Sequence, residues 1–263
     1  MELTDTQFER YARHLILDEV GEDGQMRLLQ SRVLVVGAGG LGAPLLLYLA
    51  AAGVGTLGVI DDDVVELSNL QRQVIHVTDR LGLPKVESAA AMLQEINPDV
   101  RVIQHRARLT ADNAMTIIAD YDLVADGSDN FTTRFLLNDA CFLLRKTLVS
   151  AALLRFDAQM STYKAYLGEP HPCYRCLFPE RPPEDLIPRC EQAGILGALA
   201  GAVGSLQATE VLKEVLGIGD SLSGHLLIYD ALAASFRKIK IRRDPNCALC
   251  GPQATIKDVK AIS

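Results

Sequence analysis

The stretch Arg32-Val-Leu-Val-Val-Gly-Ala-Gly-Gly-Leu-Gly42 decides the fold class. Residues 33–36 are apolar and mostly β-branched, without polar alternation, which is typical of a strand buried on both faces of a sheet. A Gly-x-Gly-x-x-Gly motif follows at once, and an Ala- and Leu-rich stretch then runs to Gly53. A strand, a tight glycine turn and a helix in this order place backbone N–H groups where they can hold a phosphate. The alternative is a glycine turn with a structural role only.

Strands and helices alternate on the C-terminal side of this stretch. The predicted strands cover residues 55–60, 100–105, 121–125 and 147–153, and the predicted helices cover residues 84–96, 111–119 and 130–144. Such alternation at short intervals implies a parallel sheet with helices on both faces. We therefore expect an α/β fold with a doubly wound, mainly parallel, Rossmann-like sheet.

The two ends of the chain differ from this core. Residues 4–30 have apolar positions at helical spacing and predict one or two short helices. Residues 159–166 alternate like an exposed strand, and residues 169–189 are rich in proline and charge without periodicity, which indicates a long surface loop. Residues 193–216 predict an Ala/Gly-rich helix packed on the sheet or on a second subunit, and residues 226–241 predict a hairpin.

These segments predict one domain over residues 1–263. We expect a helical arm at 1–30 and a nucleotide-binding core at 31–155. Residues 156–263 then supply a crossover loop, a packing helix and a C-terminal antiparallel extension.

The composition excludes several classes of protein. Of the 263 residues, 22% are charged and 5% aromatic, the profile of an ordinary α/β protein and not of a disordered or collagenous one. The net charge of −7 argues against a surface that binds nucleic acid or anionic membrane. The start is polar and acidic, and no apolar run reaches about 18 residues, so we expect a cytoplasmic protein without a secretory signal or membrane span.

Polar residues gather where the predicted strands end. Asp61 lies about 20 residues beyond the glycine motif, where a carboxylate accepts ribose hydroxyls, and on this basis alone NAD is favoured over other nucleotides. Residues 68–73, Lys85 and residues 126–130 also follow strands, so we expect all of them at the carboxyl edge of the sheet. An Arg, a Lys and an Asp around a phosphate loop are typical of a site for a triphosphate with Mg²⁺. They suit the NAD site of a dehydrogenase less well.

Each of these residues also has a structural interpretation. In this interpretation Arg72 and Lys85, each taken alone, are solvated surface charges, and Asp129 is the N-cap of the following helix. A dehydrogenase, for its part, needs a second substrate domain with a His or Tyr acid, and no such segment is evident.

Four of the six cysteines form the pairs Cys173-Tyr-Arg-Cys176 and Cys247-Ala-Leu-Cys250. Two such pairs supply four thiolates for a tetrahedral, structural zinc ion that staples the C-terminal extension, and a redox dithiol is the alternative. Cys141 lies in an apolar helical pattern and is expected to be a buried small hydrophobe. Cys190 follows Arg189 just ahead of a predicted helix, which would favour its thiolate, but without a nearby His an inert cysteine is the preferred interpretation.

Five motifs in order make the chain similar to the ThiF/MoeB/HesA family, the bacterial relatives of ubiquitin-activating enzymes, over residues 4–251. The motifs are the glycine loop, Asp-x-Asp-x-Val-x-x-Ser-Asn-Leu-x-Arg-Gln, Gly-x-Pro-Lys, Asp-x-Ser-Asp-Asn and the paired Cys-x-x-Cys. The resemblance implies ATP-dependent adenylation of the C-terminal carboxylate of a small ubiquitin-fold sulfur carrier ending in Gly-Gly, with release of pyrophosphate. ATP thereby displaces NAD as the expected ligand.

Carried over by motif, the resemblance implies roles for particular residues. Arg13, in Arg10-Tyr-Ala-Arg13, matches an arm arginine that reaches the ATP of the opposite subunit, which implies a homodimer, and His14 stands where the family has Gln. Asp129 takes Mg²⁺. The implied catalytic residues are Arg13, Arg72, Lys85, Asp129 and, as an open alternative, Cys190. The implied nucleotide contacts are Gly37, Gly39, Gly40, Gly42, Asp61, Asp63, Ser68, Asn69, Leu70, Gln71, Arg72, Gln73, Lys85, Asp129 and Asn130.

The branch of the family is inferred from sequence likeness to its members and not from a physical argument. Residues 83–89 favour the molybdopterin-synthase adenylyltransferases over the thiamine-pathway enzymes, in which Cys190 would join the carrier covalently. No rhodanese-like domain follows Gly251, so we expect a separate sulfur donor. A non-catalytic scaffold that grips a ubiquitin-fold partner is the alternative of another class, but such a chain would have lost some of Arg72, Lys85 and Asp129.

Overall fold

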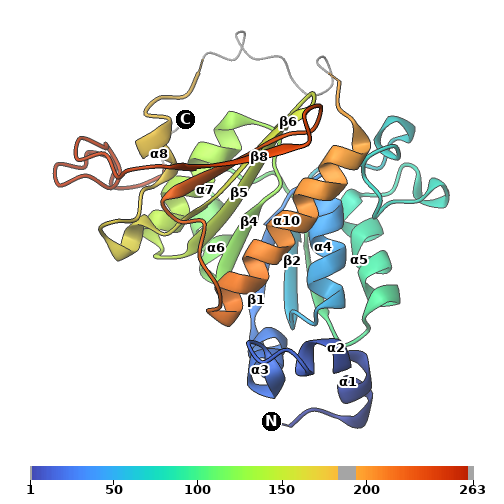
Figure 1. Ribbon diagram of the computed structural model, residues 1–263. Helices are drawn as coiled ribbons and strands as arrows, with labels where there is room; N and C mark the ends of the chain where they lie inside the picture. Colours follow the sequence, from blue (N-terminus) through green and yellow to red (C-terminus); the bar gives the residue numbers. More distant parts are fainter. Residues whose placement is uncertain (1, 183–193, 260–263) are drawn as a thin grey trace.

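Parallel and antiparallel strands share one eight-stranded sheet in the computed structural model, which describes residues 2–182 and 194–259 (Figure 1). The strand order is β3-β2-β1-β4-β5-β6-β7-β8. Neighbours from β3 to β5 are parallel, and β5 to β8 are antiparallel. The strands are β1 (Arg32–Val36), β2 (Thr56–Ile60), β3 (Arg101–His105), β4 (Leu123–Asp126), β5 (Thr147–Leu154), β6 (Asp157–Tyr163), β7 (His225–Asp230) and β8 (Ser235–Lys240).

The helices cover both faces of the parallel part, as expected for a doubly wound fold (Figure 1). They are α1 (Asp5–Arg10), α2 (Ala12–Leu15), α3 (Gly21–Gln30), α4 (Gly42–Ala51), α5 (Lys85–Ile96), α6 (Ala114–Ala119), α7 (Phe131–Leu143), α8 (Tyr174–Leu177) and α10 (Gly197–Leu216). Three short 3₁₀ turns lie at η1 (Leu67–Asn69), η2 (Thr78–Arg80) and η3 (Ala165–Leu167). None of the helices in the described ranges is both long and apolar enough to cross a membrane.

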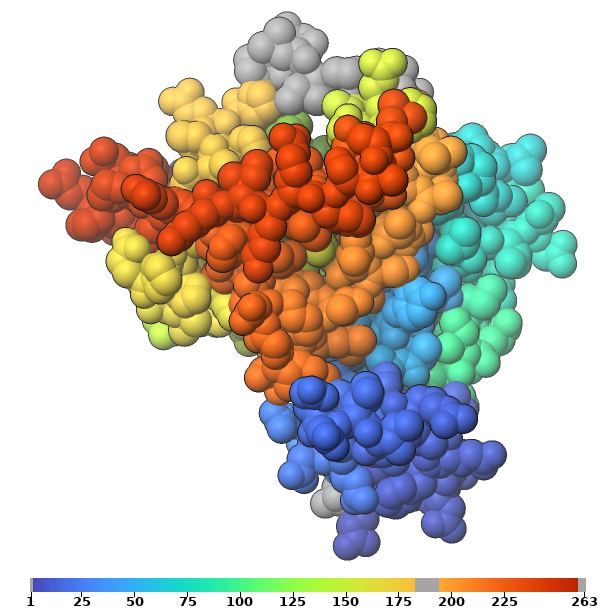
Figure 2. All heavy atoms as spheres, viewed as in Figure 1, coloured from blue at the N-terminus to red at the C-terminus, as the bar shows by residue number. Residues whose placement is uncertain are grey.

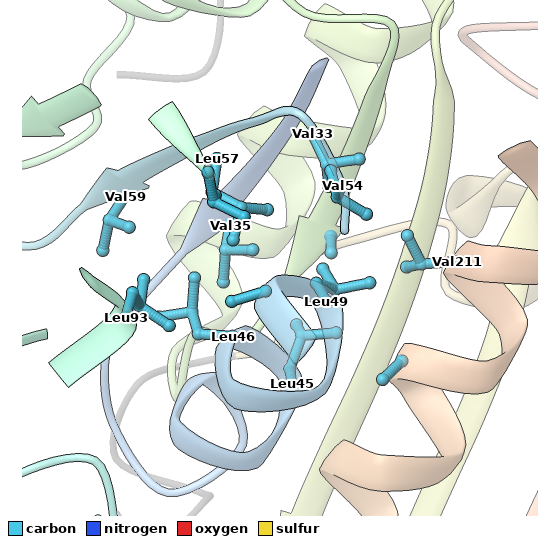
Figure 3. Close-up of a cluster of buried hydrophobic side chains, with 14 of the residues drawn as sticks. Val33, Val35, Leu45, Leu46, Leu49, Val54, Leu57, Val59, Leu93 and Val211 are labelled. Carbon is cyan, nitrogen blue, oxygen red and sulfur yellow. The ribbon is translucent and has the colours of Figure 1, made fainter. Parts of the chain in front are cut away.

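The uninterrupted apolar run of β1 is explained by burial on both sides. Val33 and Val35 point into a cluster with side chains of β2, α4, α5 and α10, shown in Figure 3. Leu34 and Val36 point to the opposite face, where they pack with α6 and α7. A strand with water on one face would have alternating apolar and polar residues. The unbroken apolar run of β1 therefore indicates that helices cover both of its faces.

Helix α10 closes the first of these layers although it comes late in the chain. Val211 lies in the same cluster as Val33, and the helix packs along α4 and β5. Gln207 is fully buried, and its Nε2 donates to the Asp126 and Val149 carbonyls at 2.8 and 3.0 Å. The predicted packing of an Ala/Gly-rich helix on the sheet is confirmed, with the helix beginning at Gly197.

Three expectations about the elements were wrong. The predicted exposed strand is β6, an interior strand that is mostly buried between β5 and β7. Its polar residues tolerate burial because Ser161 donates to the His225 carbonyl at 2.7 Å and Thr162 donates to Glu210 at 3.0 Å. The predicted loop after residue 169 contains the short helix α8, and the arm holds three helices instead of one or two.

The N-terminal helices form a lobe at the foot of the sheet (Figures 1 and 2). Tyr11 anchors this lobe: it is buried, and Asn97 donates to its hydroxyl at 2.9 Å. A Cβ at Gly53, which has φ of +84°, would lie 2.5 Å from the same hydroxyl. Both contacts lie beyond the C-terminal ends of α4 and α5, so the arm sits at the amino edge of the parallel strands.

Candidate functional site

The glycine loop connects β1 to α4 and is held in a narrow turn. Gly37 has φ of +93°, and a Cβ at Gly42 would lie 1.9 Å from the Gly37 carbonyl oxygen, so neither position accepts a side chain. A Cβ at Gly37 would also lie 2.9 Å from the Gly127 carbonyl oxygen. The glycine loop therefore touches the loop after β4, as the sequence predicts.

Asp61 binds the glycine loop from the end of β2. Its Oδ2 accepts the Ala38 N–H at 2.8 Å, and its Oδ1 accepts the Asp63 N–H at 2.9 Å. Burial raises the pKa of Asp61, and the positive charge of Lys85 opposes that rise. Within the described ranges, no acceptor takes the Gly39 or Gly40 N–H. Two backbone donors thus stand free beside the carboxylate.

Lys85 begins α5 and reaches the same corner. Its side chain is 7% exposed, and its Nζ lies 2.7 Å from Oδ2 of Asp63, whose side chain is 66% exposed. The interpretation of Lys85 as a solvated surface charge is therefore wrong. Because Asp63 remains hydrated, the ammonium can exchange this carboxylate for another anion at low cost.

Residues 66–73 run past the other side of the glycine loop. A Cβ at Gly40 would lie 3.6 Å from Cγ of Arg72, which is partly buried and donates to the Ser68 carbonyl at 3.0 Å. Asn69 is buried, and its Oδ1 accepts the Glu66 N–H at 3.2 Å. Of the remaining predicted contacts, Ser68 and Gln71 are exposed, Leu70 is partly buried, and Gln73 is buried with an Oε1 that finds no partner in the described part of the chain.

The loop between β4 and α7 is built on a buried carboxylate. Asp126 is fully buried and accepts hydrogen bonds from the hydroxyls of Ser128 and Ser150 at 2.6 and 2.7 Å, with Arg134 3.4 Å away. Asn130, not Asp129, caps α7, because its Oδ1 accepts the Thr133 N–H at 2.8 Å. Asp129 is left as an exposed carboxylate, so its interpretation as the N-cap is wrong.

His76 also touches the glycine loop, although the sequence analysis did not single it out. The side chain is buried, with Nε2 3.0 Å from the Ala38 carbonyl oxygen and Nδ1 2.9 Å from Oγ of Ser88. A lone His in a sequence carries no pattern. Its position four residues after Arg72, in a segment that wraps the glycine loop, was the available signal.

The four paired cysteines come together beside α7, where Phe142 packs against them. Their Sγ atoms lie within 4.8 Å of one another, with distances of 3.8 Å (Cys173 to Cys176), 3.5 Å (Cys173 to Cys247) and 3.4 Å (Cys176 to Cys250). A tetrahedral Zn²⁺ with bonds of about 2.3 Å needs sulfurs about 3.8 Å apart, so the donor set fits this ion. Hydrogen bonding to Cys173 lowers the pKa of Cys176 to about 7, which favours the thiolate form.

Charged side chains tie the cysteine cluster to α7 and to residues 165–171. Arg175, inside the first pair, makes a two-pronged ion pair with Asp139, its Nε and Nη2 lying 2.8 and 2.7 Å from the two carboxylate oxygens, and Asp139 is fully buried. Arg243 donates to the Ala165 and His171 carbonyls at 2.7 and 3.0 Å. Cys141 is buried on the same helix, as predicted.

Among the predicted catalytic residues that the structure describes, Arg13 is not brought to this edge. Arg13 lies in α2, exposed, at the amino edge of the sheet, while the glycine loop lies at the N-terminal end of α4. The ten residues of α4 span about 15 Å, so Arg13 is far from the glycine loop of its own chain. Cys190 lies outside the described residues.

The fold and this edge define the class of the protein: a doubly wound α/β protein with a Rossmann-like glycine loop, ringed by cations and carboxylates, and a separate four-cysteine cluster. The chain belongs to the ThiF family, whose model matches residues 11–249.

Relatives of known name align along nearly the whole chain. It is 52% identical over 261 residues to the sulfur carrier protein adenylyltransferase of Thermus thermophilus, covering 98% of this chain and 96% of that protein. It is also 52% identical over 251 residues to the SAMP-activating enzyme E1 of Haloferax volcanii, covering 95% and 92%. To the adenylyltransferase and sulfurtransferase MOCS3 of Bos taurus it is 49% identical over 259 residues, but it spans 56% of that longer protein.

Solved structures with the same fold are more distant in sequence. E. coli MccB with ATP superposes with a TM-score of 0.77 at 18% identity, covering 94% of this chain and 82% of that one. E. coli MccB with MccA-N7isoASN gives 0.79 at 19% identity, covering 94% and 76%. These identities establish the shared fold alone.

Proposed function

We propose that the protein is an ATP-dependent adenylyltransferase of a small ubiquitin-fold sulfur carrier. The observation that carries the proposal is one edge of the sheet, where the glycine loop presents two free backbone N–H groups and Arg72 and Lys85 lie close to it. Such an arrangement suits a polyphosphate, because the N–H groups and the two cations offset the negative charge of the phosphates. The reaction of a carboxylate with such a phosphate needs no general base. The named activity of the Thermus thermophilus relative, aligned over 96% of its length, supports the carrier as substrate.

The proposed roles follow the chemistry of each group. Asp61 has lone pairs left for the ribose hydroxyls beside the two N–H groups it already accepts. Asn69, Arg72 and Lys85 bind the phosphates. Asp129, an oxygen donor on the loop that touches Gly37, would hold Mg²⁺, a cation that prefers carboxylate ligands. The remaining proposed contacts come from the backbone of the glycine loop and of residues 68–73, and from Asp63 and Asn130.

The reaction is a displacement at the α-phosphorus of ATP. A carboxylate oxygen of the carrier's last glycine bonds to phosphorus, the bond to the pyrophosphate oxygen breaks, and the products are the acyl-adenylate and pyrophosphate. Both reactants are anions, so the protein's contribution is to bring them together and to neutralise charge on the oxygens with Arg72 and Lys85. A tail without side chains, Gly-Gly, suits a narrow approach to this phosphorus.

We propose that the active unit is a homodimer. Arg13 points to solvent at the amino edge of its own sheet, where it has no partner within the described residues. A second copy that places this arginine beside the neighbour's phosphates would complete the site. The four-cysteine cluster we propose as a structural zinc site, with Cys173, Cys176, Cys247 and Cys250 leaving no coordination position for substrate.

Among carriers, we propose the small subunit of molybdopterin synthase, on the likeness at residues 83–89. The thiamine-pathway carrier is the alternative, and in either case a separate protein would donate sulfur. The cytoplasmic location remains a prediction.

Exchange of radiolabelled pyrophosphate into ATP tests the proposal. Purified protein with the matching carrier should catalyse exchange, because adenylation is reversible before sulfur enters. A carrier lacking its last glycine is the matched control and should support none. Absence of exchange with every Gly-Gly carrier offered would refute the adenylyltransferase assignment, and exchange with the thiamine carrier alone would move the protein to that branch.

A further inference from the structure

His76 joins two parts of the candidate site through its two ring nitrogens. Nε2 lies 3.0 Å from the Ala38 carbonyl oxygen, which has no proton to give, so Nε2 carries the hydrogen and donates it. Nδ1 therefore accepts from the Ser88 hydroxyl at 2.9 Å. Ser88 lies in the first turn of α5, the helix that Lys85 begins. The imidazole thus links the glycine loop to the element that carries the proposed phosphate-binding lysine.

Ala38 is held on both of its backbone polar atoms. Its N–H donates to Asp61 at 2.8 Å and its carbonyl accepts from His76. A peptide unit is planar and trans, so the N–H of Gly39 points opposite to the Ala38 carbonyl. Because that carbonyl is turned inward to a buried imidazole, the Gly39 N–H is turned away from it.

The direction of this N–H matters because nothing in the described part of the chain accepts it. Gly39 and Gly40 both carry free donors in this loop, and free N–H groups at a helix N-terminus bind anions. If the Ala38–Gly39 peptide rotated, the donor would be replaced by a carbonyl oxygen that repels phosphate. A rotation of this kind is open to a glycine-rich loop unless a neighbour prevents it.

We propose that His76 is a positioning residue that locks the Ala38–Gly39 peptide with its N–H directed at the phosphates of the bound nucleotide. The inference rests on the proposed function. Burial, opposed by the hydrogen bond to the Ala38 carbonyl and aided by the positive charges of Lys85 and Arg80, lowers the pKa of His76 to about 4, so the ring stays neutral in ordinary buffers. The neutral ring keeps its single hydrogen on Nε2, where the carbonyl needs it.

A set of variants separates positioning from packing. His76→Gln places an amide donor close to the position of Nε2, and His76→Met fills a similar volume without any donor. His76→Asn has an amide too short to reach Ala38. Binding of ATP is measured by calorimetry, and the melting temperature of each variant reports its folding.

We expect His76→Met and His76→Asn to raise the Kd for ATP about tenfold, since an unsatisfied carbonyl and a misdirected donor each cost about one hydrogen bond. His76→Gln should stay within about threefold of the wild-type Kd. If Met does not fold, the Gln and Asn pair still decides the question. Equal ATP affinity in wild type and Asn, or equal losses in Gln and Asn, would overturn the proposal. A wild-type protein that binds no ATP would refute the proposed function itself and this inference with it.

Discussion

At the scale of single residues, substitutions of Lys85 and Asp129 test the effect of their charges on the reaction without unfolding the protein. Lys85→Met keeps the buried stem and removes the ammonium, and Asp129→Asn keeps the shape of an exposed side chain. Each should reduce pyrophosphate exchange by a factor on the order of 10², because each acts on phosphate charge in the transition state. The melting temperature should barely change, since the partner Asp63 is hydrated and Asp129 caps no helix.

Two exposed residues away from the site serve as controls for these variants. Lys240→Met in β8 and Asp220→Asn after α10 remove the same charges and should leave exchange unchanged. A variant at Lys85 or Asp129 that unfolded while keeping full activity per folded molecule would show a structural residue instead.

His76 also makes the stability of the protein depend on pH in a calculable direction. Its pKa falls from 6.5 in the unfolded chain to about 4 in the fold, so between these values the unfolded chain binds more protons. The free energy of unfolding is therefore undiminished above about pH 6.5 and falls as the pH drops toward 4. His76→Gln does not titrate, and the stability difference between wild type and this variant should shrink by about 2 kcal/mol from about pH 7 to pH 5. Denaturant titrations at the two pH values measure it, and parallel curves would contradict the buried neutral ring.

At the scale of elements, the cysteine cluster joins the C-terminal extension to α8 and, through Arg175 and Asp139, to α7. We expect one zinc ion per chain by metal analysis. Cys176→Ser should release the metal and lower the melting temperature by about 10 °C, since a structural zinc site contributes folding energy directly.

Cys141→Ala is the matched control for the cluster, because this cysteine is buried on α7 but belongs to a different apolar cluster. It should keep a full complement of zinc. A wild-type protein without zinc, or with a disulfide in either Cys-x-x-Cys pair, would rule the metal site out.

The elements also show which features can be predicted from sequence. The strand, turn and helix at residues 32–53 follow from local patterns, since apolar runs and glycine spacing act within a few residues. The interior position of β6 does not, because Ser161 and Thr162 become buried only through partners more than 40 residues away. The burial of Lys85 and the capping of α7 by Asn130 instead of Asp129 depend on side-chain geometry that several spacings permit. The role of His76 could not be predicted, because its partners are a backbone carbonyl and a serine, and such a pair produces no sequence motif.

At the scale of the whole molecule, the proposed homodimer predicts complementation between inactive subunits. Arg13→Ala and Asp129→Asn subunits carrying different tags are mixed, and the mixed dimers are purified. Each mixed dimer then has one intact site, because the Arg13 of one chain meets the Asp129 of the other, and it should show about half the activity of a wild-type dimer.

The control pairs Lys85→Met with Asp129→Asn subunits. Both changes fall on the glycine-loop side of their own chains, so no intact site forms and the mixed dimers should stay inactive. Mixed Arg13→Ala and Asp129→Asn dimers without recovered activity would show that Arg13 does not act across the interface.

The late position of α10 in the chain has a consequence for synthesis on the ribosome. The glycine loop and all five parallel strands are complete by residue 154, yet the part of one apolar face that lies over β4 and β5 is covered by α10, which ends at Leu216. At about 5–20 residues per second, the nascent chain exposes this face for roughly 3–12 s. During that time the Asp126 and Val149 carbonyls lack the amide donor that Gln207 supplies in the finished fold. A chaperone that shields apolar surface would therefore find its substrate in the half-made protein, and a stalled chain would aggregate through the face that α10 normally covers.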